Sequence, residues 1–319
     1  MKKKIIIISG DPNSINSEII LKTWKKLNKE VKKKTYFISN SLLLKNQFKK
    51  LNSKQKIIQV KNLNDQKNCN FIKVLNLDLN FKNPFKVSKK HSSKFVNECL
   101  NFGHNLALRD DVAGIINCPI DKKLLKKKNI GVTEILASMC DVKDNSEVML
   151  IKSKNFAVAP LTTHLDLKDV SKRINKKIII NKIKIINHWF KKFLKKKPKI
   201  GVLGLNPHNA ELRDNSEEKK FIIPAIKILK KNNINVYGPL VADTVFINHY
   251  KKLNVILGMY HDQVLTPFKS IFRYDAINIT LGLKYLRLSP DHGVASNLIG
   301  KNEANHESLL HCVKFLNRF

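Results

Sequence analysis

The sequence predicts an α/β protein with a mostly parallel sheet. Short apolar runs rich in Ile, Val and Leu alternate with amphipathic stretches, a pattern typical of strands and helices in turn. Several of these runs end directly in polar loops, as strands do at the ligand-binding edge of open sheets. With 319 residues, of which 43% are hydrophobic, the chain can fill the core of one large or two medium domains.

The expected elements of the N-terminal third form a scaffold. Ile5 to Ser9 is the predicted first strand, and a polar loop leads from it into a helix over about Glu18 to Lys29, with Ser17 as its expected N-cap. From Val31 to about Lys90, basic helical pieces alternate with short strands, and no residue pattern there indicates chemistry. Two of the expected strands in this region are Thr35 to Ser39 and Lys56 to Val60.

The middle of the chain brings the first polar residues that suit a site. A helix is expected near Ser92 to Leu108, followed by a strand over Val112 to Asn117. A second helix opens at Gly131. Its first turn holds Thr133 and Glu134, which would present a hydroxyl and a carboxylate to a cleft.

Three later strands each end in a loop that carries one histidine. Carboxyl ends of parallel strands lie along one edge of a sheet, so these imidazoles can converge. Neutral imidazoles suit a divalent ion such as Zn, Co, Mn or Ni, and three protein ligands leave positions open for substrate. The alternative for any one of them is a histidine that only bonds a nearby carbonyl. The predicted strands and histidines are Phe156 to Leu161 with His164, Lys199 to Leu205 with His208, and Asn254 to Met259 with His261.

Further polar residues follow the last of these histidines. Lys269 and Arg287 supply two cations, and Asn278 supplies an amide, at intervals that a substrate site could use. The alternative for the two cations is that they are merely two of 60 Lys and Arg residues.

Composition excludes several classes of function. The formal net charge of +35 comes from lysines spread along the chain together with Asn and Ile, without Arg-rich clusters interleaved with aromatics. An anionic substrate therefore fits better than a specific nucleic acid. The five cysteines are scattered and form no C-x-x-C pair, which indicates a reducing compartment. No apolar run approaches the roughly 18 residues that span a membrane, so we expect a cytoplasmic protein.

Eight motifs, taken in order, resemble one known family. They are GDPNSINSE, NCPIDK, GVTEILA, LTTHLDL, GLNPHNAEL, GPLVADTVF, MYHDQVLTPFK and NITLGLKYLRLSPDHGVA, between Gly10 and about Gly300. The family is that of the 4-hydroxythreonine-4-phosphate dehydrogenases of pyridoxal phosphate biosynthesis. The resemblance implies a fold similar to isocitrate and isopropylmalate dehydrogenases, with residues 1–319 forming a single catalytic unit of two interleaved α/β subdomains around a central cleft. It also implies a homodimer whose active site is shared between subunits.

The resemblance further implies the activity and the cofactors. The reaction is oxidation of 4-phosphohydroxy-L-threonine to 2-amino-3-oxo-4-phosphohydroxybutanoate, which decarboxylates to 3-amino-2-oxopropyl phosphate. NAD is the implied oxidant, with NADP as an alternative. No residue is predicted to contact the dinucleotide, since the chain lacks a G-x-G-x-x-G fingerprint.

Functional residues carry over from the family's motifs. The implied ligands of a divalent metal (Zn, Mg or Co) are His164, His208 and His261, with His261 reaching the partner's site. The implied substrate-binding residues are Thr133, Lys269, Asn278 and Arg287.

Three residues are candidates for catalysis or for orienting ligands. Lys269 would ease loss of the substrate's hydroxyl proton as well as bind an anion. Asp262 and Asp243 would orient ligands or transfer protons. The alternative for Asp243 is a turn or cap residue.

The chain departs from the family pattern at three places. Val132 stands where the family has a histidine that contacts substrate, the first loop differs over Asn13 to Ser17, and the glycine-rich stretch after the second histidine is replaced by Asn209 to Arg213. Two alternatives therefore stay open. One is a dehydrogenase of threonate or erythronate 4-phosphate, and the other is a non-enzymatic polyanion-binding protein.

Overall fold

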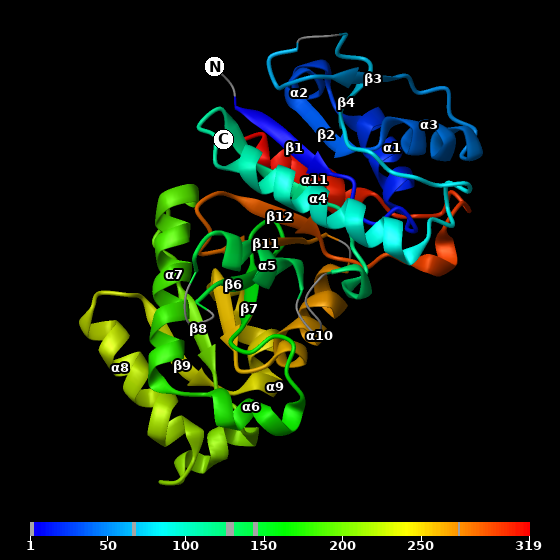
Figure 1. Cartoon of the computed structure of the whole chain (residues 1–319). Coiled ribbons are helices and arrows are strands. Elements are labelled where there is room, and N and C mark those ends of the chain that lie inside the picture. The colour runs from blue at the N-terminus through cyan, green and yellow to red at the C-terminus, as the bar shows by residue number, and fades with distance from the viewer. Residues whose placement is uncertain (1–2, 66–67, 126–130, 143–145, 274) are drawn as a thin grey trace. The chain divides into compact units, whose positions relative to one another are not determined.

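The computed structural model describes residues 3–65, 68–125, 131–142, 146–273 and 275–319. The chain divides into two compact units. Unit 1 comprises Met1–Asp141 and Leu283–Phe319, and unit 2 comprises Val142–Gly282. Figure 1 shows the elements of both units along the chain.

Unit 1 contains parallel strands in the order β3-β4-β2-β1-β5-β12. The central strand β1 is buried along Ile5 to Ile8, which explains its run of four isoleucines, because a parallel strand is covered on both faces. The strands are β1 (Lys4–Ile8), β2 (Thr35–Ser39), β3 (Ile57–Val60), β4 (Ile72–Asn76), β5 (Val112–Asn117) and β12 (Arg287–Pro290).

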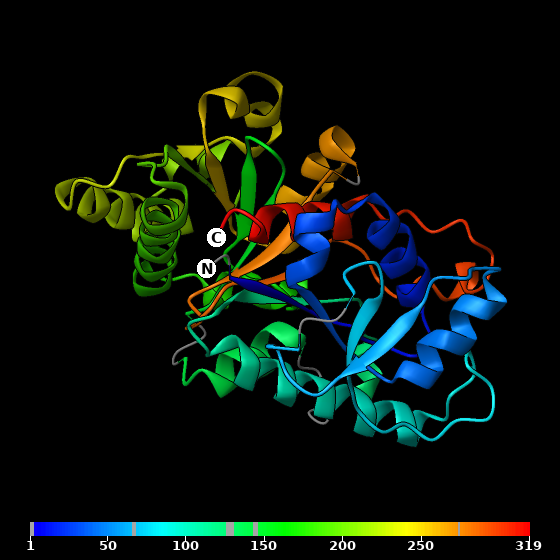
Figure 2. The ribbon, with the colours of Figure 1, turned by 90° about the horizontal axis from the view of Figure 1, so that it is seen from above.

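Helices cover both faces of the unit 1 strands. In Figure 2, α4 lies on one face, and α1 and α11 lie on the other. The helices are α1 (Asn16–Lys26), α2 (Lys29–Lys34), α3 (Ser41–Lys50), α4 (Lys89–Ala107), α5 (Val132–Met139) and α11 (Glu307–Leu316), with short turns η1 (Lys122–Leu124) and η6 (Ser296–Leu298).

The start of α1 differs from the prediction. Ile15, not Ser17, occupies the N-cap position, and no side chain caps the helix there. Ser17 lies inside the first turn and is buried. The expectation was wrong because the polar loop before the helix folds inward, where Ser14 bonds the carbonyl of Asp11 at 2.5 Å.

Unit 2 contains strands in the order β11-β6-β7-β10-β8-β9. Strands β7, β10, β8 and β9 are parallel, whereas β6 runs antiparallel to β7 and β11. The tight turn between β6 and β7 cannot hold a crossover, and so these two strands must be antiparallel. The strands are β6 (Val148–Lys152), β7 (Ala157–Pro160), β8 (Ile200–Leu203), β9 (Val236–Leu240), β10 (Val255–Gly258) and β11 (Ile277–Leu281).

The core of unit 2 gathers aromatic and aliphatic side chains around Phe156. Its ring stacks on Phe268 at 6.1 Å between centroids, which packs α10 against the sheet. In Figure 1, α7 and α8 lie side by side, to the left of β8 and β9 in this view. The mostly parallel α/β architecture is confirmed. The helices are α6 (Leu167–Arg173), α7 (Lys176–Leu194), α8 (Ile223–Lys231), α9 (Ala242–Thr244) and α10 (His261–Phe272), with short 3-10 segments η2 (Pro207–Leu212) and η5 (Tyr250–Lys252) and short π-helical segments η3 (Glu218–Ile222) and η4 (Val245–His249).

Candidate active site

The three predicted histidines follow three neighbouring parallel strands of unit 2. His164 follows β7, His261 follows β10 and His208 follows β8, and β10 lies between the other two strands. The expectation that these strands share an edge is therefore confirmed. The rings of His164 and His261 approach each other, with centroids 6.3 Å apart and planes inclined by 35°.

The three histidines do not form a metal cluster within one chain. Within the described residues, no group of three His, Cys, Asp or Glu side chains is close enough to hold a metal. A site that takes one histidine from a second subunit does not require such a group within one chain. The donor set of three imidazoles at one sheet edge still fits a borderline divalent ion.

The backbone around His208 has an unusual conformation. Five successive non-glycine residues, His208 to Leu212, have φ between 46° and 57°. This left-handed conformation costs roughly 1–2 kcal/mol per residue, because Cβ approaches the following carbonyl oxygen. Glycine, which carries no Cβ, adopts this conformation at lower cost, but none of the five residues is glycine.

The ring of His261 is oriented by its neighbour in sequence. Its Nδ1 lies 2.6 Å from Oδ1 of Asp262. A carboxylate can only accept here, so Nδ1 carries the proton and Nε2 is left to bind a ligand. Asp243 is exposed at the start of α9, and no hydrogen bond joins it to the three histidines among the described residues.

Two polar side chains, the half-buried Gln263 and the buried Glu218, tie the histidine loops to the sheet. Gln263 accepts from the amide of Met259 at 2.7 Å and donates to the carbonyl of Gly204 at 2.8 Å, so it links the ends of β10 and β8. Glu218 is 0% exposed, and its Oε1 accepts from the amides of Leu205 and Asn206, both at 2.8 Å.

The charge of Glu218 is compensated by these amides. Burial opposes ionisation, but the hydrogen bonds from Asn206 and Leu205 outweigh it and lower the pKa of Glu218. Sequence reasoning missed Glu218, because a glutamate at the start of a helix is ordinarily a solvated residue.

Arg287 and Thr133 lie together in unit 1. The Arg287 side chain is 3% exposed; its Nη1 donates to Oγ1 of Thr133 at 3.1 Å, and its Nε donates to Oδ1 of Asn117 at 2.6 Å. Burial lowers the pKa of Arg287 to about 10. Asn117 ends β5 and was not among the predicted site residues, although the motif NCPIDK begins with it.

Two predicted substrate residues belong to unit 2. Lys269 is exposed in the last turn of α10, the helix that begins with His261. Asn278 lies in β11, and its Oδ1 is buried without a hydrogen-bond partner among the described residues. A buried acceptor of this kind suits an external donor such as an ammonium or hydroxyl group.

Val132 is the first residue of α5, directly before Thr133, and is half-buried. This position therefore holds an apolar side chain and no imidazole, next to the Thr133 hydroxyl that accepts from Arg287.

A cavity of about 320 Å³ also lies in unit 2. It is lined in part by Lys154, Phe156, Tyr250 and Phe272, which precede β7 and β10 or end α10. The histidines follow the opposite ends of these strands, and the cavity is therefore not part of the histidine site.

The fold and these residues define an α/β protein with a histidine-lined sheet edge and a buried cation, a combination suited to a small anionic ligand. Residues 28–316 match the family described as pyridoxal phosphate biosynthetic protein PdxA, and the chain belongs to this family. At the level of this dehydrogenase family, a nicotinamide cofactor is implied.

Three relatives illustrate the similarity. A 4-hydroxythreonine-4-phosphate dehydrogenase from Sulfurihydrogenibium sp. is 37% identical over 319 residues, which covers 98% of this chain and 96% of the relative. A candidate D-threonate 4-phosphate dehydrogenase from Oceanobacillus iheyensis is 32% identical over 330 residues, which covers 97% of this chain and 96% of the relative. The crystal structure of a 4-hydroxythreonine-4-phosphate dehydrogenase from Burkholderia phymatum superposes with a TM-score of 0.82 at 25% identity, covering 99% and 98% of the two chains.

The helices of the described residues include none that is both long enough and apolar enough to cross a membrane.

Proposed function

We propose that this protein is a 4-hydroxythreonine-4-phosphate dehydrogenase. It oxidises the C3 hydroxyl of 4-phosphohydroxy-L-threonine with NAD, and the resulting β-keto acid loses carbon dioxide to give 3-amino-2-oxopropyl phosphate. The observation that carries this proposal is the 37% identity to a dehydrogenase of that name over 98% of the chain. NADP is the alternative oxidant.

His164, His208 and His261 are the proposed ligands of a divalent metal, which is Zn, Mg or Co. A metal held there supplies a Lewis acid that lowers the pKa of the substrate's C3 hydroxyl. Asp262 fixes the tautomer of His261 through the 2.6 Å contact at Nδ1. In the proposed homodimer, His261 serves the active site of the partner subunit.

The remaining side chains bind and orient the substrate. Arg287, fixed by its bonds to Thr133 and Asn117, offers a cation in a set orientation to the phosphate or the carboxylate. Lys269 is a second cation, and its ammonium favours loss of the hydroxyl proton by stabilising the oxyanion. The buried Oδ1 of Asn278 is suited to accept from the substrate's amino group.

The chemistry balances with these groups. With NAD bound, C3 would give a hydride to the nicotinamide ring, and the hydroxyl proton would pass to a base, for which the carboxylate of Asp243 is the candidate. When carbon dioxide leaves, its bonding electron pair would stay on C2 as an enolate, and C2 would then take up a proton, which the protonated Asp243 can supply. Arg287 belongs to unit 1 and Lys269 to unit 2. We propose that residues 1–319 act as a single catalytic unit of two interleaved α/β subdomains in the cytoplasm.

The second candidate substrate is a phosphorylated sugar acid such as D-threonate or D-erythronate 4-phosphate, which the comparisons as a whole do not favour. Two observations keep it in the assay. Val132 supplies no imidazole to the pocket, and a relative at 32% identity carries a D-threonate 4-phosphate assignment.

The test is an assay of NADH and NADPH production by protein reconstituted with Zn, Mg or Co. Three substrates are compared: 4-phosphohydroxy-L-threonine, D-threonate 4-phosphate and D-erythronate 4-phosphate, with a chelated sample and the His208→Ala variant as controls. We expect oxidation of the first substrate and loss of activity in both controls. Turnover of a sugar-acid phosphate alone would replace the substrate, and salt-sensitive RNA binding without any turnover would favour the non-enzymatic alternative.

A further inference from the structure

We propose that Glu218 is a positioning residue that holds the loop of His208 in its metal-binding conformation before metal or substrate arrives. The inference rests on the proposed function insofar as His208 is taken as a ligand. It adds a residue from a separate element, η3, to the machinery of the histidine edge.

The loop of His208 needs such an anchor because its own residues do not favour the conformation that they adopt. His208 to Leu212 all have positive φ, and none is glycine. A strained backbone of this kind persists only where the surrounding structure over-determines it.

The entry to this strained turn is fixed by Glu218. Its Oε1 accepts from the amides of Leu205 and Asn206 at 2.8 Å, and its Oε2 accepts from Nδ2 of Asn206 at 3.0 Å. Among the described residues Glu218 forms no ion pair. Its negative charge is therefore compensated by the loop itself, which couples burial of the carboxylate to the loop conformation.

Gly204, which precedes the two residues bonded by Glu218, is held as well. The carbonyl of Gly204 accepts from Gln263, which lies in the first turn of α10 beside His261. A Cβ at Gly204 would lie 2.1 Å from Oδ1 of Asn209, so the strained turn folds back directly onto this glycine. Gly204, Leu205 and Asn206 are thus clamped in succession.

The clamped backbone therefore holds the imidazole of His208 in position before a metal binds. If the clamp were weakened, the turn could relax toward negative φ and carry the imidazole away from its position. Metal affinity would then include the cost of restoring the turn, in the way that residues supporting a ligand ordinarily affect affinity.

The test compares Glu218→Gln with Glu217→Gln. Glu217 is the adjacent carboxylate, and among the described residues its one hydrogen-bond donor is Nδ2 of Asn206 at 2.9 Å. The probe is Co²⁺ alone, titrated into the metal-depleted full chain and followed by its visible absorption, with hydrogen exchange at the amides of Leu205 and Asn206 as a second readout.

We expect Glu218→Gln to raise the Kd for Co²⁺ about 10- to 100-fold and to speed exchange at both amides. The substitution removes the negative charge that strengthens both hydrogen bonds at Oε1, and it places an NH₂ group opposite Nδ2 of Asn206, where Oε2 now accepts. Glu217→Gln should change the Kd less than about threefold, because the hydrogen bond of Glu217 goes to the side chain of Asn206 and not to the backbone of the loop. In a His208→Ala background, Glu218→Gln should add little further loss, because its effect passes through that histidine.

Three results would overturn the proposal. They are an unchanged Kd in Glu218→Gln, an undiminished effect in the His208→Ala background, and unprotected Leu205 and Asn206 amides in the metal-depleted wild type. The last measurement needs no variant, so it decides the matter even if Glu218→Gln does not fold. Because Co²⁺ binding is read without substrate, failure of the proposed dehydrogenase activity is distinguishable from failure of this inference.

Discussion

Nε of Arg287 donates a 2.6 Å hydrogen bond to Oδ1 of Asn117, across the parallel pair β12 and β5. The backbone register sets Arg287 opposite Ile115, so the guanidinium reaches the polar end of β5. A buried cation is costly unless acceptors surround it. Asn117 therefore both stabilises the guanidinium and fixes the direction of its remaining donors.

We expect Asn117→Ala to raise the KM for the phosphorylated substrate about tenfold, equivalent to about 1.4 kcal/mol, with a smaller change in kcat. The free energy of unfolding should fall by about 1–3 kcal/mol, because a buried donor loses its acceptor. Steady-state kinetics and urea unfolding measure the two effects. Asn155→Ala, at an exposed turn, is the control and should change neither. A loss of stability without a change in KM would mean that Asn117 supports the fold alone.

The strained turn after His208 allows a stabilising substitution. Leu212 has φ 57° and is exposed, so its side chain contributes little packing. We expect Leu212→Gly to raise the free energy of unfolding by up to about 1 kcal/mol, since glycine adopts this φ without a Cβ clash. Urea unfolding measures the change.

The matched control for this substitution is Leu42→Gly. Leu42 is also an exposed leucine, but it lies in helix α3 with ordinary helical geometry. Glycine there should lower the free energy of unfolding by about 1 kcal/mol. If both variants are destabilised alike, the left-handed turn is not a source of strain.

The histidine-bearing strands could be predicted because their signal is local. Val255 to Gly258 is a short buried apolar run followed by polar residues. The change from apolar to polar residues marks the end of the strand in the sequence itself. His164 and His261 follow directly from strand order, because neighbouring parallel strands end at one edge.

Other features could not be predicted because they depend on residues distant in sequence. Asn117 meets Arg287 through strand pairing, and Glu218 reaches the 205–206 loop from another element. Ser17 shows the same limit, since a residue type that favours a cap was buried by tertiary packing instead. Positive φ at Leu212 contradicts the local preference of leucine, so only the folded surroundings can impose it.

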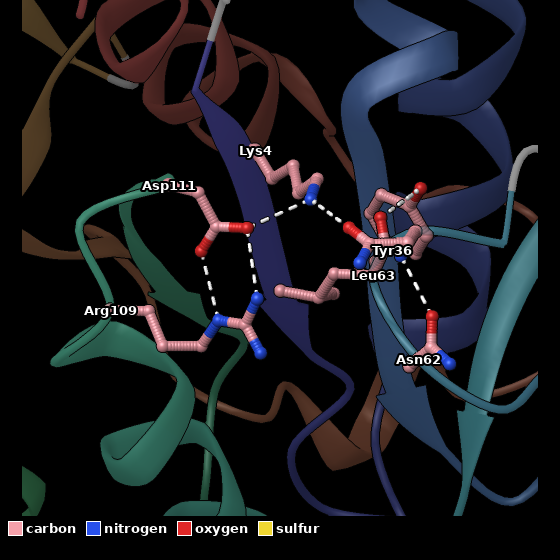
Figure 3. Close-up of polar contacts among 7 residues, drawn as sticks. Lys4, Tyr36, Asn62, Leu63, Arg109 and Asp111 are labelled. Atoms are coloured by element: carbon pink, nitrogen blue, oxygen red, sulfur yellow. Dashed lines mark hydrogen bonds and ion pairs between the residues drawn. The ribbon is translucent and has the colours of Figure 1, made fainter.

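A salt-bridge cluster at the start of β1 predicts a pH dependence (Figure 3). Oδ2 of Asp111 lies 2.8 Å from Nζ of Lys4, and the Arg109 guanidinium bonds both carboxylate oxygens. The hydrogen bonds from Arg109 and Lys4 hold the pKa of Asp111 well below its usual range. A depressed carboxyl pKa gives stability that is present above the unfolded pKa of about 4 and is lost as pH falls below it.

We therefore expect Asp111→Asn to lower the free energy of unfolding at pH 7 by at most about 1 kcal/mol, because the carboxylate is 40% exposed and partly screened. The difference between variant and wild type should shrink as pH falls from 4 toward 2 in urea titrations. Asp141→Asn, which removes the more exposed pair with Lys284, should have almost no effect. A pH-independent difference would show that the charge of Asp111 is not what stabilises the cluster.

Lys73 in β4 predicts a second pH dependence of the free energy of unfolding. Its cause is a buried cation rather than an ion-paired carboxylate. Its side chain is 1% exposed, its ammonium donates to the carbonyl of Lys33, and Nζ lies 3.9 Å from the centroid of the Tyr36 ring. Burial lowers the pKa of Lys73 to about 8, against an ordinary value of 10.5. Between these two values the unfolded chain binds a proton that the folded chain does not, so this residue's contribution to stability rises with pH.

Lys73→Met isolates this contribution. Below pH 8 the wild type carries a buried charge that methionine lacks, and the variant should be the more stable of the two by a margin that does not depend on pH. From pH 8 to 10.5 that margin should shrink by up to about 3 kcal/mol, at 1.36 kcal/mol per pKa unit. Urea unfolding of both proteins across this range measures the margin, with Lys252→Met, at an exposed position, as the control. A margin that stays constant through pH 10 would mean that Lys73 keeps its ordinary pKa and that its hydrogen bond and cation–π contact offset the cost of burial.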